Sequence, residues 1–436
     1  MLQIRPTASI HHDSESYLTE FQSAIAEWLP YPPQIAAVVT DNEAALRKAV
    51  RDSGHPSLGC FVHTIQLAVK AAMRLDEVSE LLGRAKHLIK LFRHSPLRLA
   101  KLHESSKMLG EEKLQVLSWS KTRWGSLLIA LRRLLILRSA INLTIDPEVS
   151  AARLSDEEWV SLQAICAILA PVEATCKGES GQQYATLSLV LLHLHNLKKL
   201  EHPVLEETPV AKLFRLQLWE CIKQRFQLCS EESGFYVLGM MLDPRFRNSS
   251  CCLRFLGDPV RGIQLWDHTR KRLLSLVSKC IQSSSSIVPD IVSSQVAPPP
   301  VQSQSGMFSA LYTVEQERRQ RQFVRVGEIG EQVGQEVDSY LRGEAILPHN
   351  MDGSPSDILQ WWKANAYKWP HVARVARSVL AIPASSVPSE RVFSKAGELL
   401  TTKRHRMKAK QVDMFLFLNQ NKEYINNLQF PAEKRS

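Results

Sequence analysis

The sequence predicts an α/β protein with a dominant helical part, and three observations support this fold class. The apolar run Ile35–Thr40 is short and rich in β-branched residues, which is typical of one buried strand. From Asp76 to Cys280, apolar residues recur at the spacing of packed amphipathic helices. The chain has 436 residues, 44% of them hydrophobic, which is enough for about two or three domains with a sizeable core.

The composition narrows the class of protein before any motif is considered. A net charge of +10 at pH 7 favours an acidic partner, of which nucleic acid is the commonest. The eight cysteines have no framework spacing, so we expect reduced and mostly buried thiols. No apolar run reaches the roughly 20 residues that span a bilayer, and the N-terminus has no apolar signal core. We therefore expect an intracellular protein with no membrane partner.

The first elements alternate between helix and strand. We expect helices over Ser16–Leu29, Asn42–Val50 and Cys60–Met73, in addition to the strand that ends at Thr40. Asp41 follows the end of that strand, a position at which α/β folds commonly hold functional acids. Taken alone, Asp41 is more simply explained as the cap of the helix that follows.

Cys60 and His63 have the spacing of half a zinc site. A structural zinc site needs four ligands, and no second pair follows, because Cys251 and Cys252 are adjacent and His268 is isolated. The residues alone therefore do not predict a bound zinc ion.

The helical region that begins at Asp76 is strongly basic. Between Arg84 and Lys107, the only acidic residue is Glu104, whereas seven residues are basic: Arg84, Lys86, Lys90, Arg93, Arg98, Lys101 and Lys107. Five more follow with no acid among them: Lys121, Arg123, Arg132, Arg133 and Arg138. Solvated helix faces usually mix charge signs, which allows pairs to form along the helix. A face of one sign instead suits a phosphate backbone, since each neutralised phosphate releases counterions.

Farther along, the helical pattern continues and is then interrupted. Ser155 and Glu158 have the spacing of a capping box, whereas Asp243, just before a proline, is expected to cap a turn. The Ser- and Pro-rich stretch Gln282–Gln304 has no apolar periodicity and should be a disordered loop. A charged helix over Thr313–Leu341 follows it.

The stretch Ala381–Gly397 has the pattern of a loop that leads into a helix. We expect Ser389 to cap this helix and Glu390 to lie in its first turn, where the helix dipole favours a carboxylate. The helix should bury one apolar face: Val392, Phe393 and Ala396.

The last predicted helix, Gln411–Tyr424, is apolar nearly all round. Such a helix needs burial on more than one side, which its own domain or a symmetric partner can supply. Lys403 and Arg404 belong to a second basic cluster just before it.

Three motifs together resemble the hAT superfamily of transposases. The run PASSVPSERVFSKAG, with Trp361-Trp362-Lys363 before it and Val412–Leu418 after it, is similar to the C-terminal dimerisation region of these enzymes. VVTDNEAALRKAV, followed by Gly59–Thr64, and the run Thr122–Ser126 resemble two further family motifs. Within the superfamily, the chain looks like a transposase-derived protein of the BED-type zinc-finger group without the BED finger. The resemblance implies a truncated RNase H-like core interrupted by a large all-α insertion.

The resemblance also implies roles for residues at a catalytic centre. Asp41 and Glu390 match the second and third acids of a metal-binding set whose first aspartate we do not find upstream of Asp41. Because the metal site needs its full set of carboxylates, we expect vestigial catalysis and no cofactor, with Mg²⁺ or Mn²⁺ only where the acid set is complete. Cys60 and His63 should lie beside this centre. Trp124 is expected either in the core or stacked on an unpaired base.

Two surfaces follow from the basic stretches and the resemblance together. The expected DNA contacts are Arg123, Trp124, Arg132, Arg133, Lys403 and Arg404. The expected dimerisation residues are Trp361, Trp362, Val412, Phe415 and Leu416.

The expected organisation is a truncated RNase H-like part over 1–75, a helical insertion over 76–280, a disordered linker over 281–312, and a dimerisation region over 313–436 that completes the core. We expect a nuclear, DNA-binding homodimer derived from an hAT transposase, without efficient nuclease activity. Two alternatives stay open at this point. One is a truncated form of an active transposase that works by metal-dependent phosphoryl transfer. The other is a helical protein-interaction scaffold.

Overall fold

The computed structural model consists mostly of helices, which confirms the predicted dominance of helical structure. It describes residues 13–29, 35–120, 124–145, 151–181, 184–227, 231–247, 259–285, 330–350, 355–399, 409–422 and 425. The chain divides into two compact units built from segments that are distant in the sequence. Unit 1 comprises Met1–Thr186, Leu192–Gln227 and Ile382–Ser436, and unit 2 comprises Leu187–Leu191 and Leu228–Ala381.

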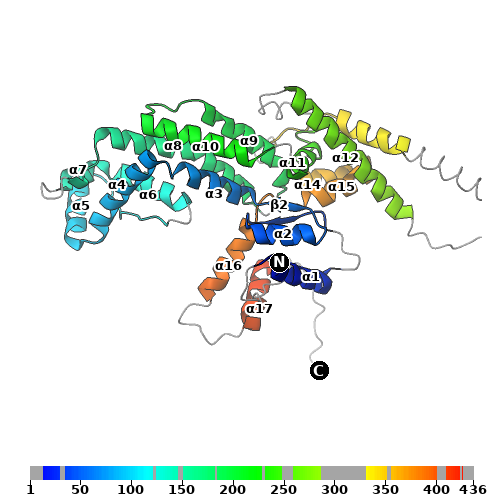
Figure 1. Ribbon diagram of the computed structural model, residues 1–436, viewed down its shortest axis with the longest axis horizontal. Helices are drawn as coiled ribbons and strands as arrows, with labels where there is room; N and C mark the ends of the chain where they lie inside the picture. The colour runs from blue at the N-terminus through cyan, green and yellow to red at the C-terminus, as the bar shows by residue number, and fades with distance from the viewer. Residues whose placement is uncertain are drawn as a thin grey trace, which may run out of the picture. The chain divides into compact units, whose positions relative to one another are not determined.

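Unit 1 begins with a small parallel sheet and the helices around it. Its first elements are α1 (Ser14–Trp28), β1 (Val38–Thr40), α2 (Ala44–Asp52), β2 (Ser57–Gly59) and α3 (Phe61–Ala72) (Figure 1). In the parallel pair, Val38 lies opposite Ser57 and Thr40 opposite Gly59. Helix α2 connects the two strands, because a tight turn cannot join parallel strands. The described sheet has two strands, so the RNase H-like core stays a prediction.

The rest of unit 1 is a helical array completed by the C-terminal helices. Its helices are α4 (Asp76–Arg93), α5 (Pro96–Met108), α6 (Trp124–Ile136), α7 (Arg138–Thr144), α8 (Asp156–Glu179), α10 (Pro209–Arg225), α16 (Val387–Leu399) and α17 (Ala409–Gln420). Helix α9 (Val190–Leu197) and the 3-10 helix η3 (Lys198–Glu201) precede α10. Helix α3 packs against α8 and α10, and α6 packs against α8 (Figure 1). Phe61, Trp159 and Phe214 are fully buried in this array, which forms the largest described core.

Helix α8 shows how the local sequence sets an element and its burial. The predicted capping box is confirmed: the Ser155 Oγ accepts from the Glu158 N–H at 3.2 Å, and the Glu158 carboxylate accepts from the Ser155 N–H at 2.7 Å. By length and composition alone α8 is apolar enough to cross a membrane, with a mean hydropathy of 1.5. However, 56% of that apolar window is buried inside the protein, as is usual for a core helix.

Unit 2 is helical in all its described regular elements. These are η2 (Leu187–Leu189), α11 (Glu231–Met241), α12 (Pro259–Ser285), a helix over residues 330–342, α14 (Ile358–Asn365) and α15 (Pro370–Leu380). Helices α11 and α12 pack against each other and against α15. Tyr340 is fully buried, and the Trp362 indole N–H donates to the Leu242 carbonyl at 3.0 Å. Asp243 accepts from the Arg245 backbone N–H at 3.0 Å, as expected of a turn cap.

The predicted disordered stretch begins too early. Ser283–Ser285 belong to α12, which runs on to Ser285 because the helix pattern that starts at Pro259 is not interrupted there by proline or glycine. The rest of that stretch, and the start of the helix predicted over Thr313–Leu341, lie outside the described residues. The helix over residues 330–342 agrees with the end of that prediction.

The two C-terminal helices differ from the prediction in their start and in their burial. Helix α16 begins at Val387, so Ser389 lies inside its first turn and does not cap it; the Val387 N–H donates to the Ser385 Oγ at 3.1 Å. Glu390 is in the first turn, as predicted. Val392 is buried, but Phe393 is 57% exposed and does not face inward. Helix α17 packs against α16 through one face only.

Candidate functional site

The junction between β2 and α3 is held to the C-terminal segment of unit 1 by backbone hydrogen bonds. The Phe61 N–H donates to the Ala384 carbonyl at 2.9 Å, and the Ala384 N–H donates to the Thr186 Oγ1 at 2.8 Å. The Cys60 N–H donates to the Thr40 carbonyl at 2.8 Å, which ties the same junction to β1. The loop before α16 is therefore fixed against the sheet, and Glu390 is carried to the same place as Asp41.

His63 is the residue around which the predicted acids meet. Its Nδ1 lies 3.4 Å from the Glu390 Oε1, and its side chain is 29% exposed. Hydrogen bonding with Cys60 is the largest influence on the pKa of His63 and raises it; burial opposes this, and the carboxylates of Glu390 and Asp41 raise it further. The structure thus brings together Asp41, Cys60, His63 and Glu390.

Cys60 is a buried thiol whose ionisation is favoured by its neighbours. Burial raises the pKa of this thiol, but hydrogen bonds from His63, Ser385 and Ser386 outweigh burial and lower it to about 7. The Cys60 Sγ lies 3.4 Å from the Ser385 Oγ and 3.3 Å from the Ser386 amide nitrogen. Cys166, Cys176 and Cys221 are also buried and Cys280 is half-buried, which agrees with the expectation that the cysteines are mostly buried.

The loop that carries Asp41 is positioned by residues the sequence reasoning did not single out. The Asn42 side-chain amide donates to the Thr64 Oγ1 at 3.0 Å, and so fixes the turn after β1 to α3. A Cβ on Gly59 would lie 2.5 Å from the Asn42 Oδ1, so glycine allows the Asn42 side chain to approach the end of β2 this closely. The Glu43 N–H donates to the Asp41 Oδ1 at 3.3 Å, so Asp41 also stabilises the start of α2. Asn42 lies in the run VVTDNEAALRKAV and Thr64 in the run Gly59–Thr64, both of which resemble hAT sequences. That resemblance was the signal in the sequence from which these two residues could have been found.

The donor set at this site does not fit a divalent metal. Among the residues the structure describes, no three His, Cys, Asp or Glu side chains are grouped so as to hold a metal ion. A site of this type needs clustered carboxylates, whereas Glu390 directs an oxygen at His63. We therefore derive no chemical step through a metal from these residues.

The predicted DNA contacts that the structure describes lie on α6, and both arginines among them already have partners. The Arg132 Nη1 lies 2.7 Å from the Glu173 Oε2, and the Arg133 Nη1 donates to the Gln115 carbonyl at 2.9 Å. Trp124 is 7% exposed. Arg123, Lys403 and Arg404 lie outside the described residues.

The predicted dimerisation residues are divided between the two units. In unit 2, Trp362 is buried, and Trp361 stacks on Trp369 with ring centroids 6.0 Å apart. In unit 1, Val412 and Leu416 are buried, and Phe415 is 49% exposed. The exposed apolar residues beside Phe415 on α16 and α17, which the prediction did not include, are Phe393, Met414, Phe417 and Leu418.

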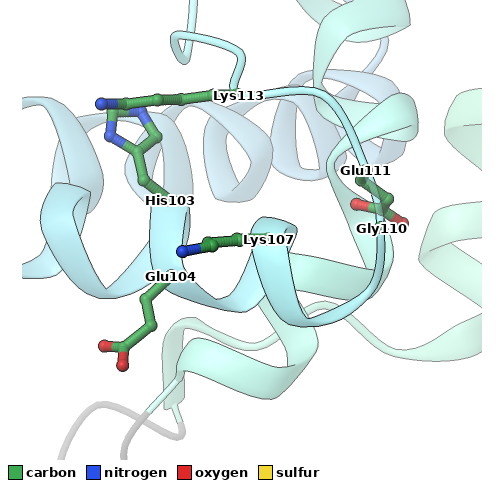
Figure 2. Close-up of a pocket in the computed structure, with 6 residues that line it drawn as sticks. All are labelled: His103, Glu104, Lys107, Gly110, Glu111 and Lys113. Atoms are coloured by element: carbon green, nitrogen blue, oxygen red, sulfur yellow. The ribbon is translucent and has the colours of Figure 1, made fainter.

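A cavity of about 550 Å³ lies at the end of α5, away from the sites predicted from the sequence. Figure 2 shows side chains of α5 and of the loop that follows it around this cavity. It is lined by His103, Glu104, Lys107, Gly110, Glu111 and Lys113, none of which belongs to a predicted site. With both charge signs present and no apolar lining residue, the cavity does not have the character of a small-molecule site.

Comparisons with known proteins identify two regions of the chain. Residues 336–422 match the hAT family C-terminal dimerisation region, and residues 58–168 match the ZBED1 RNase-like helical domain. The predicted resemblance is therefore confirmed: the chain carries the dimerisation region of hAT proteins together with the helical domain of BED-type proteins.

Individual relatives extend this similarity over most of the chain. "Zinc finger BED domain-containing protein 4" of Homo sapiens is 25% identical over 394 residues, which is 89% of this chain and 31% of that protein. "Putative AC transposase" of Zea mays is 23% identical over 388 residues, which is 87% of this chain and 46% of that protein. "Zinc finger BED domain-containing protein DAYSLEEPER" of Arabidopsis thaliana is 38% identical over 64 residues, which is 15% of this chain and 9% of that protein. The chain thus spans less than half the length of these relatives.

Proposed function

We propose that the chain is a hAT transposase-derived, nuclear protein that binds DNA and forms homodimers, without efficient nuclease activity of its own. The observation that carries this proposal is the meeting of Asp41 and Glu390 at His63. Two acids from opposite ends of the chain converge as they would in a transposase centre, yet the Glu390 oxygen lies 3.4 Å from an imidazole nitrogen. A site in which an imidazole lies beside the glutamate offers fewer carboxylates than two metal ions need.

DNA binding is supported by charge and by the relatives. The net charge of +10 gives the chain a sequence-independent attraction to phosphates. Proteins related over most of its length include a putative transposase and a BED-type zinc-finger protein. Nuclear placement follows from the same two arguments.

Self-association is supported by the exposed apolar face of α16 and α17. Helix α17 packs against α16 and buries Val412 and Leu416, whereas Phe393, Phe415 and Leu418 are on the surface at 57%, 49% and 49% exposure. Apolar side chains gathered in this way are typical of an interface. The face lies within the matched dimerisation region, 336–422.

The test of DNA binding is the affinity of the chain for a short duplex across a salt series. We expect log K to fall linearly with log salt, because counterions are released from the phosphates that the chain neutralises. The same duplex, incubated with Mg²⁺ or Mn²⁺, should stay uncut. Cutting that is abolished by Glu390→Ala would refute the absence of nuclease activity and favour the active transposase. Absent or salt-independent binding would refute the DNA-binding role and favour the scaffold.

The test of self-association is the molecular mass of the chain by sedimentation equilibrium. Phe415→Ser with Leu418→Ser should convert a dimer into a monomer, since the substitutions remove apolar surface that only a partner covers. The matched control is Leu205→Ser, because Leu205 is 90% exposed in unit 1 outside this face. A dimer that survives the double substitution would exclude this face as the interface.

A further inference from the structure

The turn between α4 and α5 gathers cations at one end of a helical hairpin. We call Lys90, Arg93, His94 and Arg98 the hairpin tip. Helix α4 ends at Arg93 and α5 begins at Pro96, with the Ser95 Oγ accepting from the Arg98 N–H at 3.3 Å. The two helices pack against each other, so the four residues lie close together, at the end of α4, in the turn and at the start of α5. Lys90, Arg93 and His94 are exposed, and Arg98 is half-buried.

Among the described residues the tip cations have no carboxylate partner, whereas several arginines of the array have one. Elsewhere, Arg84 lies 2.6 Å from Glu158, and Arg138 lies 2.6 Å from Asp156. Within the described ranges of the chain, no carboxylate lies within ion-pair distance of Lys90, Arg93 or Arg98. The sequence explains this, because the nearest acids before and after the tip are Glu80 and Glu104.

An unpaired cation and a paired cation are not equivalent as ligands for phosphate. Arg132 would have to give up its 2.7 Å contact with Glu173, and leave that carboxylate to Lys177 alone, before it could neutralise a phosphate. The cations of the tip exchange only water and counterions, so the full gain from counterion release is available to them. Side chains three and four residues apart on a helix are neighbours, so several tip cations can approach one strand together.

We propose that the hairpin tip of α4 and α5 is the surface with which the chain contacts the phosphate backbone of a DNA duplex. This inference rests on the proposed DNA-binding function, and names the residues that carry it. The tip belongs to the basic stretch noted in the sequence, but it lies outside the contacts expected there: Arg123, Trp124, Arg132, Arg133, Lys403 and Arg404. The tip makes backbone contacts, and therefore adds affinity without sequence preference.

The experiment compares three pairs of charge-removing substitutions in the duplex salt series. The test pair is Lys90→Gln with Arg93→Gln. The matched control is Lys48→Gln with Arg51→Gln, an exposed Lys and Arg at the same spacing near the end of α2. Lys90 and Arg93 lie in the last turn of α4 and Arg51 in the last turn of α2, so the control pair also removes a cation near a helix C-terminus. The third pair is Arg132→Gln with Arg133→Gln.

The proposal predicts that the test pair makes the negative slope of log K against log salt less steep by about 2. Lys90→Gln alone should make it less steep by about 1. The control pair should leave the slope unchanged. Equal losses for the test and control pairs would overturn the proposal, because they would reflect only the net charge of the chain. A loss confined to the third pair would overturn it in favour of Arg132 and Arg133. If the unaltered chain binds no duplex, the proposed function fails as well, whereas binding that ignores the test pair refutes the tip alone.

Discussion

Substitution of Glu207 by glutamine should destabilise unit 1 strongly, because it breaks a buried ion pair. The Arg215 guanidinium makes a two-pronged contact with the Glu207 carboxylate, at 2.5 Å from Nε and 2.9 Å from Nη2. Its remaining nitrogen donates to the Leu200 carbonyl at 2.7 Å. The two side chains are only 4% and 7% exposed. Helix α10, which carries Arg215, packs against α3, the helix that carries His63.

The expected magnitude follows from the burial of the pair. Removing one partner of a buried ion pair leaves an uncompensated charge and costs about 3–5 kcal/mol. For a unit of this size, that loss lowers the midpoint of thermal unfolding by on the order of 10 °C. The measurement is thermal unfolding followed by far-ultraviolet circular dichroism. The control is Glu220→Gln on the same protein, because Glu220 pairs with Lys223 at the surface and its loss should change the midpoint little.

Two results would refute this reasoning. The first is a Glu207→Gln midpoint that matches the Glu220→Gln control. The second is a failure of the double substitution Glu207→Leu with Arg215→Met to recover stability, because an apolar pair of similar volume removes the buried charge altogether.

Two further predictions concern single residues. Ser385→Ala removes a hydrogen bond to the Cys60 thiol, so the pKa of Cys60 should rise above about 7. The measurement is the thiolate absorbance as a function of pH, with Cys60→Ala as the reference. Because folding lowers this pKa from 9.0, the thiol's contribution to stability is present above pH 9 and is lost as the pH falls through about 7. Gly343→Ala places a Cβ 2.5 Å from the Arg247 Nη2, and should displace the guanidinium from the Tyr340 and Trp361 rings at a cost of about 1–3 kcal/mol. Tryptophan emission would then move to longer wavelength, and an unchanged spectrum would contradict the prediction.

The local elements of this fold were predictable where the signal lies within one turn of chain. The capping box of Ser155 and the helix that follows the Cys60 motif are both found as expected, since caps and helical spacing depend on neighbouring residues. The start of α16 was misjudged because Ser385, four residues before Ser389, provides the competing hydrogen bond to Val387. The exposure of Phe393 was misjudged because periodicity shows that a helix has an apolar face, and does not show whether anything covers it.

The charge pattern was harder to interpret from the sequence, because the acidic residues that pair with these arginines lie on other helices. Arg132 and Glu173 are 41 residues apart, and Arg138 and Asp156 are 18 apart, so part of a run of one sign in the sequence is paired with acids in space. Lys90 and Arg93 are among the cations with no carboxylate partner in the described part of the chain, and both are exposed. Ion pairing across the fold therefore decides which of the many cations are available to a phosphate.

The same argument separates the acid site from the DNA-binding surface. At the acid site, the sequence motifs correctly brought Asp41 and Glu390 to one place, but His63 partly compensates the charge that a metal would need. At the hairpin tip, no described carboxylate pairs with Lys90, Arg93 or Arg98. A protein with these two features should keep its attraction for nucleic acid while its cutting chemistry is weak. Binding and cleavage are therefore separable in this chain, and substitutions at Glu390 should leave duplex affinity intact while substitutions at Lys90 and Arg93 should reduce it.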